Sequence, residues 1–350
     1  MNTWPEYLDT KPGWIGTVLL GAFVALLVWY FAASYLAHRQ LPPTSEKMLT
    51  PHDDLLAIDG SEGGKNVAVG KWGLILVTND RGKSWERRPT DTTKALSAIS
   101  MADDKHAFAV GSGGTVLSTQ DGGATWRSQA SGSKDQLLGV HALSSTHAYV
   151  VGAFGTLLST TDGGTSWTRH EIKWDQLIGK IINESGYIEP NLNAIYFSSP
   201  TKGWIVGEFG LVLHTEDGGR TWTAQRSGSD LPQLYSVKFI DDQRGWASGQ
   251  AGSLIRTTDG GKRWNTVEID SKRDLYNVSV DGQRLIIVGD GIAFGSDDTG
   301  SSWKEIRLNS EDRWLAGVLV KDRAALAVGP GGTIETLNLD NPGSIPMEKR

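Results

Sequence analysis

Two acidic residues, Glu208 and Asp290, stand at equivalent points of a recurring pattern, each directly after a glycine that ends an apolar run. Two carboxylates that face one another can hydrolyse a glycosidic bond, one as the acid and the other as the base or nucleophile. Acidic residues are plentiful in this chain, so chance placement of these two is the alternative. The pattern alone therefore assigns no catalytic residue.

The sequence lacks the residues that several other kinds of chemistry need. The seven histidines show neither HxH nor HExxH spacing, and no phosphate-binding loop or dinucleotide fingerprint is present, so we expect no metal site and no cofactor. The absence of cysteine excludes disulfides and thiolate chemistry. A net charge of −6 argues against nucleic acid as a partner, because nucleic-acid binding needs a basic surface.

An internal repeat organises most of the chain. The glycines that end its apolar runs are 41, 41, 55, 42, 40 and 40 residues apart, and they are Gly70, Gly111, Gly152, Gly207, Gly249, Gly289 and Gly329. Each unit divides into about four short strand-like runs, which are A to D in chain order. Four short strands about every 40 residues are typical of a β-propeller, in which each unit is one blade.

Six of the seven units carry a second signature, Asp-x-Gly-x-x-Trp, in most copies with serine or threonine before the tryptophan. In such a turn the aspartate accepts backbone hydrogen bonds, the glycine supplies a positive φ, and the tryptophan buries a large ring. We expect these residues to clip the C and D strands together as a structural motif. They are Asp80 and Trp85, Asp121 and Trp126, Asp162 and Trp167, Asp217 and Trp222, Asp259 and Trp264, and Asp298 and Trp303.

These clips resemble those of the Asp-box, or bacterial neuraminidase repeat, propellers. With seven units behind an apolar segment, the chain is similar to the photosystem II assembly and stability factor family and its non-photosynthetic bacterial relatives, over about residues 54–338. The resemblance implies an all-β, seven-bladed β-propeller that is not an enzyme. Sialidases carry the same clips, but the arginine-isoleucine-proline segment expected before their first box is absent here. A sialidase-like glycoside hydrolase stays as an alternative.

One apolar segment precedes the repeats. Residues 14–36 contain no charged side chain and are long enough to span a bilayer, so they predict a single transmembrane helix that contacts lipid; a cleaved signal peptide is the alternative. The predicted organisation is a leader at 1–13, this helix, a stalk at 37–53, the propeller at 54–340 and a tail at 341–350. The resemblance implies that the propeller lies on the periplasmic side of a bacterial inner membrane.

The last unit has three strand-like runs and no clip. Because an open sheet edge is a liability, residues 44–50 are one candidate for the outer strand that closes the ring. A three-stranded final blade is the alternative.

The B–C turns and the D–A crossings of a propeller share one face, and the irregular features of this sequence gather there. Three B–C turns hold a large aromatic residue, namely Trp72, Phe154 and Phe209. An insertion at 173–191, a D–A crossing, has the spacing of an amphipathic helix. Partner-binding residues are therefore expected among these aromatics and the apolar residues of the insertion, Trp174, Ile178, Ile181, Ile182 and Tyr187. The alternative is that the insertion packs on the ring and the aromatics plug the channel.

Basic residues also follow the clips and form a candidate patch for an acidic partner or lipid headgroups, with simple solvation as the alternative. They are Arg87, Arg88, Arg127, Arg169, His170, Lys173, Arg226, Lys272, Arg273 and Arg307. The function expected from these features is that of a membrane-anchored scaffold, which binds a membrane protein complex and helps to assemble or stabilise it. An accessory subunit of an inner-membrane transporter is the alternative among binding proteins.

Serine at Trp72, Phe154 and Phe209 is expected to weaken partner binding without unfolding the ring, because interface energy is concentrated in aromatic anchors. Co-purification from mild detergent measures the effect. An unchanged yield of partner would exclude this face.

Overall fold

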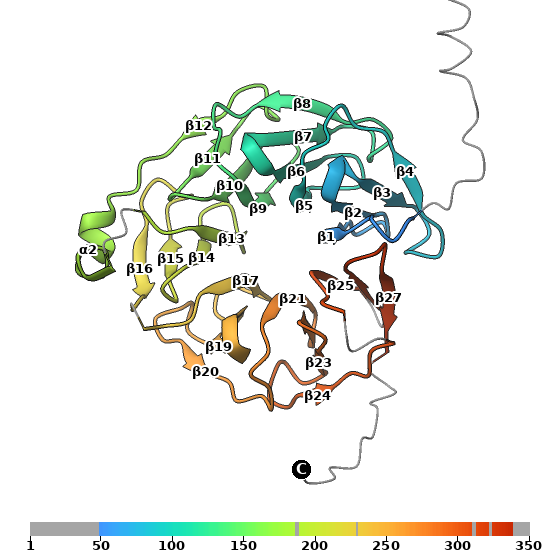
Figure 1. Ribbon diagram of the computed structural model, residues 1–350. Coiled ribbons are helices and arrows are strands. Elements are labelled where there is room, and N and C mark those ends of the chain that lie inside the picture. Colours follow the sequence, from blue (N-terminus) through green and yellow to red (C-terminus); the bar gives the residue numbers. More distant parts are fainter. Residues whose placement is uncertain (1–48, 186–188, 229, 310–312, 322–323, 339–350) are drawn as a thin grey trace, which may run out of the picture. The chain divides into compact units, whose positions relative to one another are not determined.

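The computed structural model describes residues 49–185, 189–228, 230–309, 313–321 and 324–338. In the unit that begins at Leu49, seven antiparallel sheets stand around a central axis (Figure 1). In each sheet the strands follow one another in chain order, with the first strand innermost. The expected all-β, seven-bladed propeller is confirmed.

The strands of the first four blades are as follows. Blade 1 holds β1 (Leu55–Gly60), β2 (Asn66–Gly70), β3 (Ile75–Thr78) and β4 (Glu86–Arg88). Blade 2 holds β5 (Leu96–Met101), β6 (Ala107–Gly111), β7 (Thr115–Thr119) and β8 (Arg127–Ala130). Blade 3 holds β9 (Leu137–Ala142), β10 (Ala148–Gly152), β11 (Leu157–Thr160) and β12 (Thr168–Arg169). Blade 4 holds β13 (Leu192–Phe197), β14 (Gly203–Gly207), β15 (Val212–Thr215) and β16 (Thr223–Arg226).

The remaining blades repeat this order. Blade 5 holds β17 (Leu234–Phe239), β18 (Gly245–Gly249), β19 (Leu254–Thr257) and β20 (Asn265–Thr266). Blade 6 holds β21 (Leu275–Asp281), β22 (Arg284–Gly289), β23 (Ala293–Ser296) and β24 (Lys304–Glu305). Blade 7 holds β25 (Gly317–Lys321), β26 (Ala324–Val328) and β27 (Ile334–Leu337). The helix α2 (Trp174–Ser185) lies outside the ring between blades 3 and 4 (Figure 1).

The hydrophobic core consists of seven clusters, one between each pair of neighbouring blades. Between blades 1 and 2, for example, Val67 and Val69 of β2 pack against Leu96 and Ile99 of β5. The B strands have apolar side chains on both faces because each face meets a neighbouring blade, and β6 is buried along its whole length. The continuous apolar runs of the sequence, which end in the repeat glycines, therefore become the B strands.

Hydrogen bonds between neighbouring inner strands hold the blades in register. The fifth residue of an inner strand reaches the backbone of the next blade, so Ser100 Oγ accepts from the Ala142 N–H at 3.1 Å and Ser279 Oγ accepts from the Val320 N–H at 3.0 Å. In blade 4, Tyr196 donates to the Phe239 carbonyl at 3.0 Å. The channel wall is thus joined by side chains across the gaps between sheets.

The Asp boxes, which are the six predicted clips, share one geometry. In blade 2 the Asp121 carboxylate accepts from the Thr125 N–H at 2.9 Å and from the Thr125 hydroxyl at 2.6 Å. The buried Thr119 hydroxyl donates to Asp121 at 2.8 Å and accepts from the Gly123 N–H at 2.9 Å. Arg263 replaces the hydroxyl residue in blade 5, so Asp259 accepts only its backbone N–H from that side.

These bonds favour the ionised aspartates. Hydrogen bonds from Thr125 lower the pKa of Asp121 to about 2, and those from Ser166 lower the pKa of Asp162 to about 2. The pKa of Asp259 is also lowered, chiefly by the backbone N–H of Arg263. In each clip an ionised aspartate therefore accepts hydrogen bonds from uncharged N–H and O–H groups.

Each of the first three Asp-box tryptophans packs against the preceding blade. Trp126 joins Val77 of blade 1, and the Trp167 ring meets Phe108 of blade 2 edge-on, with centroids 5.9 Å apart. Trp85 of blade 1 packs against Leu326 of blade 7, which closes the ring. The tryptophan therefore joins sheets as well as strands.

Blade 7 has three strands in the part of the chain that the structure describes. Of the candidate closing segment 44–50, residues 44–48 lie outside the described residues, so its role stays a prediction. The predicted transmembrane helix at 14–36 and the tail at 341–350 lie outside them as well. Among the described residues, no helix combines the length and the apolar character needed to cross a bilayer.

Replacing Thr119 with valine is expected to destabilise the fold by about 1–3 kcal/mol, because the buried Gly123 N–H loses its acceptor. Thr119→Ser keeps the hydroxyl, as Ser296 does in blade 6, and is the matched control. Chemical denaturation measures both. Equal losses in the two variants would contradict the assigned role of the hydroxyl.

The lowered pKa values also predict a window of acid unfolding. A carboxyl group whose pKa falls from 3.8 in the unfolded chain to about 2 in the fold stabilises the fold above pH 3.8. That contribution disappears as the pH falls through about 2. Circular dichroism is expected to show the stability falling over this range, and a stability that is constant between pH 4 and pH 2 would contradict it.

Candidate functional site

The turns divide between two faces of the ring, as predicted. On one face the residue after the Asp-box aspartate bonds to the A–B turn of its own blade; in blade 2 the Gly122 N–H donates to the Lys105 carbonyl at 2.8 Å. On the other, B–C turns bond to D–A crossings, and the Gly73 N–H donates to the Lys94 carbonyl at 2.9 Å. We name these the Asp-box face and the B–C face.

The B–C turns place their middle residue in the left-handed region. The φ angle there is 60° at Trp72, 53° at Phe154 and 58° at Phe209, against 62° at the equivalent Gly113. This conformation favours glycine, since a Cβ atom there crowds the following carbonyl. Three blades therefore keep an aromatic residue where glycine would be less strained.

Two of these aromatics are exposed and one is not. Trp72 is 68% and Phe154 59% exposed, and they are the exposed large hydrophobic residues of the described chain. Phe209 is half-buried against the cluster that joins blades 3 and 4. The B–C face thus presents two aromatic side chains to solvent, while Phe209 contributes largely to packing.

The predicted helix forms as α2, and its first turns pack on the ring. Trp174 is 6% and Ile178 3% exposed, and both belong to the core cluster between blades 3 and 4. For these two residues the structure matches the packing alternative. The side chains of Ile181 and Ile182, and all of Tyr187, lie outside the described residues. Contact of this segment with a partner stays a prediction.

Of the two acidic residues considered as a catalytic pair, Glu208 has structural partners for its carboxylate. Glu208 accepts from the Asn191 N–H at 2.8 Å and from the Asn191 side-chain amide at 3.0 Å, which fastens a D–A crossing to a B–C turn. At Asp290 the backbone carbonyl, rather than the carboxylate, accepts from Arg273 at 3.2 Å. Within the described ranges, no group of acidic and histidine residues could hold a metal ion.

The inner strands enclose a channel of about 190 Å³, which Asp59 and Lys238 help to line. Burial raises the pKa of Asp59, and Lys238 opposes that rise. Burial, together with repulsion from Lys238, lowers the pKa of His141 to about 3, so this imidazole is neutral at neutral pH. Asp59 accepts from the Met101 N–H at 2.8 Å, which is one of the inner-strand bonds between blades. Asp59 therefore joins blades 1 and 2 at the channel wall.

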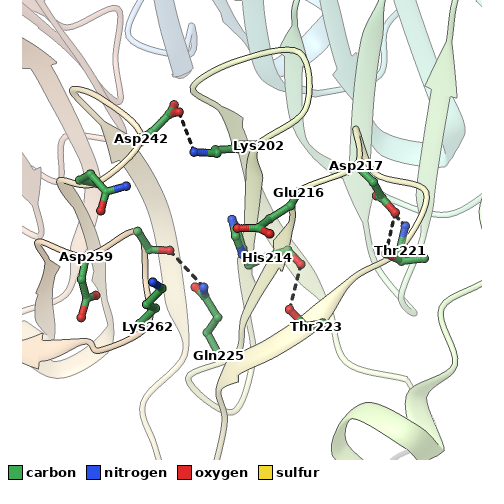
Figure 2. Close-up of a pocket in the computed structure, with 12 residues that line it drawn as sticks. Lys202, His214, Glu216, Asp217, Thr221, Thr223, Gln225, Asp242, Asp259 and Lys262 are labelled. Atoms are coloured by element: carbon green, nitrogen blue, oxygen red, sulfur yellow. Dashed lines mark hydrogen bonds and ion pairs between the residues drawn. The ribbon is translucent and has the colours of Figure 1, made fainter.

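A larger groove of about 610 Å³ lies between blades 4 and 5 on the Asp-box face (Figure 2). Lys202 reaches across it to Asp242 at 2.9 Å, and His214 lies between them and the blade 4 clip (Figure 2). Two further acids of the groove, Asp217 and Asp259, belong to Asp boxes. Three of its carboxylates are therefore already bonded.

The repeat itself accounts for such grooves. An equivalent hollow of about 520 Å³ lies between blades 1 and 2, lined by Lys65 and Asp104 in the places of Lys202 and Asp242. There the Lys65 ammonium donates to the Gly122 carbonyl at 3.2 Å. Both grooves occur where an A–B turn meets the clip of the next blade, so their polar lining reflects the contact between blades.

Several of the basic residues that follow the clips are bonded to their own surroundings. Arg87 pairs with Asp53 at 3.3 Å, and Arg169 pairs with Asp135 at 3.1 Å. Arg226 donates to the Gly210 carbonyl at 2.9 Å. These arginines fasten D strands and D–A crossings, which accounts for part of the expected basic patch.

A family model described as "Photosynthesis system II assembly factor YCF48" matches residues 89–171, 132–233 and 229–317, which together cover more than half of the chain. No curated protein sequence matches. Among solved structures, YCF48 from Cyanidioschyzon merolae has a TM-score of 0.68 and 22% identity, covering 85% of this chain and 99% of that one.

YCF48 bound to D1 peptide has a TM-score of 0.63 and 18% identity, covering 86% of this chain and 100% of that one. The GH74 xyloglucanase from Xanthomonas campestris has a TM-score of 0.67 and 14% identity, covering 82% and 52%. At these identities the structural likenesses show the fold, whereas the family model rests on the sequence of the repeats. The chain therefore belongs to the family of the photosynthesis system II assembly factor YCF48.

Proposed function

We propose that this chain is a non-catalytic scaffold that binds a membrane protein complex and helps to assemble or stabilise it. The observation that carries the proposal is the pair of exposed aromatic residues, Trp72 and Phe154, held in left-handed turns of the B–C face. The likeness to YCF48 bound to D1 peptide supports a protein segment as the partner. In this proposal residues 14–36 anchor the propeller at the periplasmic side of a bacterial inner membrane.

The conformation of the two aromatics argues against a purely structural role. A residue other than glycine in the left-handed region costs about 1–2 kcal/mol. A buried side chain can offset that cost by packing, as the half-buried Phe209 does, but Trp72 and Phe154 remain mostly in solvent. Unlike the exposed Ala251 of blade 5, which has the same conformation, these two strained positions carry aromatic rings, and exposed aromatic residues are the usual anchors of protein interfaces.

The carboxylates of Glu208 and of the Asp boxes in the groove favour binding over glycoside hydrolysis, because each already has a structural role. Glu208 holds Asn191, and Asp217 and Asp259 hold their clips. A general acid needs a proton at neutral pH, but the pKa values of the Asp-box carboxyls are lowered. We therefore propose a binding protein, although the fold is shared with a xyloglucanase.

Glycine at both Trp72 and Phe154 is expected to separate binding from stability. Removing both aromatics should weaken partner binding by about 2 kcal/mol or more, because such anchors dominate interfaces. The fold should be unchanged or more stable, because glycine relieves the left-handed strain. Co-purification of the full-length chain from mild detergent, with thermal unfolding alongside, measures both effects.

Ala251→Gly is the matched control, since Ala251 occupies the same turn position in blade 5 with φ 54° and has no aromatic ring. It should keep full partner binding. Phe209 is left unchanged, because its loss would also remove packing. Retention of the partner by the double glycine variant would contradict the proposal.

A further inference from the structure

The middle N–H of a B–C turn has a recurring side-chain acceptor. The Ala251 N–H donates to Asp274 at 2.8 Å, and the Gly331 N–H donates to Asp54 at 3.0 Å. The Phe154 N–H donates to Asn191 at 3.1 Å. Each acceptor is the residue directly before the inner strand of the next blade. In two of these three blades the chain itself therefore places a carboxylate on this turn.

For blade 1 the residue at this position has no side-chain acceptor, and for blade 2 it makes no such bond among the described residues. Ala95 stands before β5 and the exposed Gln136 stands before β9. In the part of the chain that the structure describes, no hydrogen bond from the Trp72 N–H or the Gly113 N–H is found. Trp72 and Gly113, the middle residues of these turns, are both exposed.

Two lysines belong to the D–A crossings that contact these turns. The Lys94 carbonyl accepts from Gly73, and its ammonium donates to the Gly113 carbonyl at 3.3 Å, which places Lys94 between the turns of blades 1 and 2. Lys134 precedes Asp135, whose carbonyl accepts from Gly114 at 2.7 Å. Both lysine side chains are exposed, and neither takes part in an ion pair of the described chain.

We propose that the B–C face of blades 1 and 2 binds acidic side chains of an extended protein segment. A carboxylate of the partner accepts from the open turn N–H groups and pairs with Lys94, as Asp274 accepts from Ala251 in blade 5. Apolar side chains of the same segment pack on Trp72 and Phe154. This inference rests on the proposed function, and it names the chemistry of the partner.

The variant Ala95→Asp tests the site because it supplies a carboxylate from the chain itself. It puts a carboxylate where Asp54 and Asp274 stand in their blades, so it should bond to the Trp72 N–H and neutralise Lys94. Partner carboxylates should then bind about tenfold more weakly, because charge-assisted hydrogen bonds are lost. Ala124→Asp adds the same charge to an exposed position on the Asp-box face and is the matched control.

The probe is a short, fluorescein-labelled, C-terminally amidated peptide of alternating glutamate and phenylalanine, titrated with the full-length chain while anisotropy is measured. We expect the wild type and Ala124→Asp to bind it equally and Ala95→Asp to bind it about tenfold more weakly. Thermal unfolding of Ala95→Asp should be no lower than that of the wild type, since the variant gains a hydrogen bond.

Two further peptides identify the source of the carboxylate. Replacing glutamate with glutamine should weaken binding to the wild type, and a free C-terminus on that glutamine peptide should not restore it. Equal binding of glutamate and glutamine peptides, restoration by the free C-terminus, or full binding by Ala95→Asp would each overturn the inference. Loss of the membrane partner in the Trp72 and Phe154 glycine variant, with no effect of Ala95→Asp, would overturn this inference while leaving the proposed function intact.

Discussion

Each blade has two apolar faces, and the rest of the structure depends on burying both of them. A single sheet of four short strands cannot cover its own faces, so each blade is stabilised by its two neighbours. The seven clusters between blades meet this requirement all the way around the ring. Because the cluster with Leu326 and Val328 also contains Trp85, no blade is left with an uncovered face.

This constraint separates the stable parts of the molecule from the variable ones. The B strands and the Asp boxes cannot change much, because their side chains lie between sheets or hold the clips. The middle residue of a B–C turn is exposed in several blades, and it is tryptophan in blade 1, glycine in blade 2 and alanine in blade 5. Recognition can therefore evolve on this face without altering the core.

The repeat made much of the fold predictable from the sequence. Seven glycines at regular spacing and six clips predicted the blades and the division of the turns between two faces, and the three strand-like runs of the last unit became the three strands of blade 7. The bounds of the outer strands were harder to predict: β8 of blade 2 begins only at Arg127, because the turn of the clip extends through Trp126. Such short outer strands carry little periodic pattern.

The candidate site was less predictable, because burial there depends on contacts across blades. Trp72, Phe154 and Phe209 look alike in sequence, yet the cluster between blades 3 and 4 covers only Phe209. Trp174 and Ile178 belong to an apolar stripe that fits a docking helix equally well, but both are buried on the ring. In blades 3, 5 and 7 a side chain accepts a hydrogen bond from the middle N–H of the B–C turn. That Ala95 cannot accept the equivalent bond becomes apparent only when the turns of these blades are compared.

The first three Asp-box tryptophans pack against the preceding blade, and this arrangement has a consequence for biosynthesis. Trp126 and Trp167 find their partners in a blade that has already been made, but Trp85 needs Leu326, about 240 residues later in the chain. During synthesis, the Trp85 indole of the first blade therefore lacks its packing partner until the last blade emerges from the ribosome. Contacts of such long sequence separation form slowly, so the closing seam is a natural point for chaperones or misassembly to act.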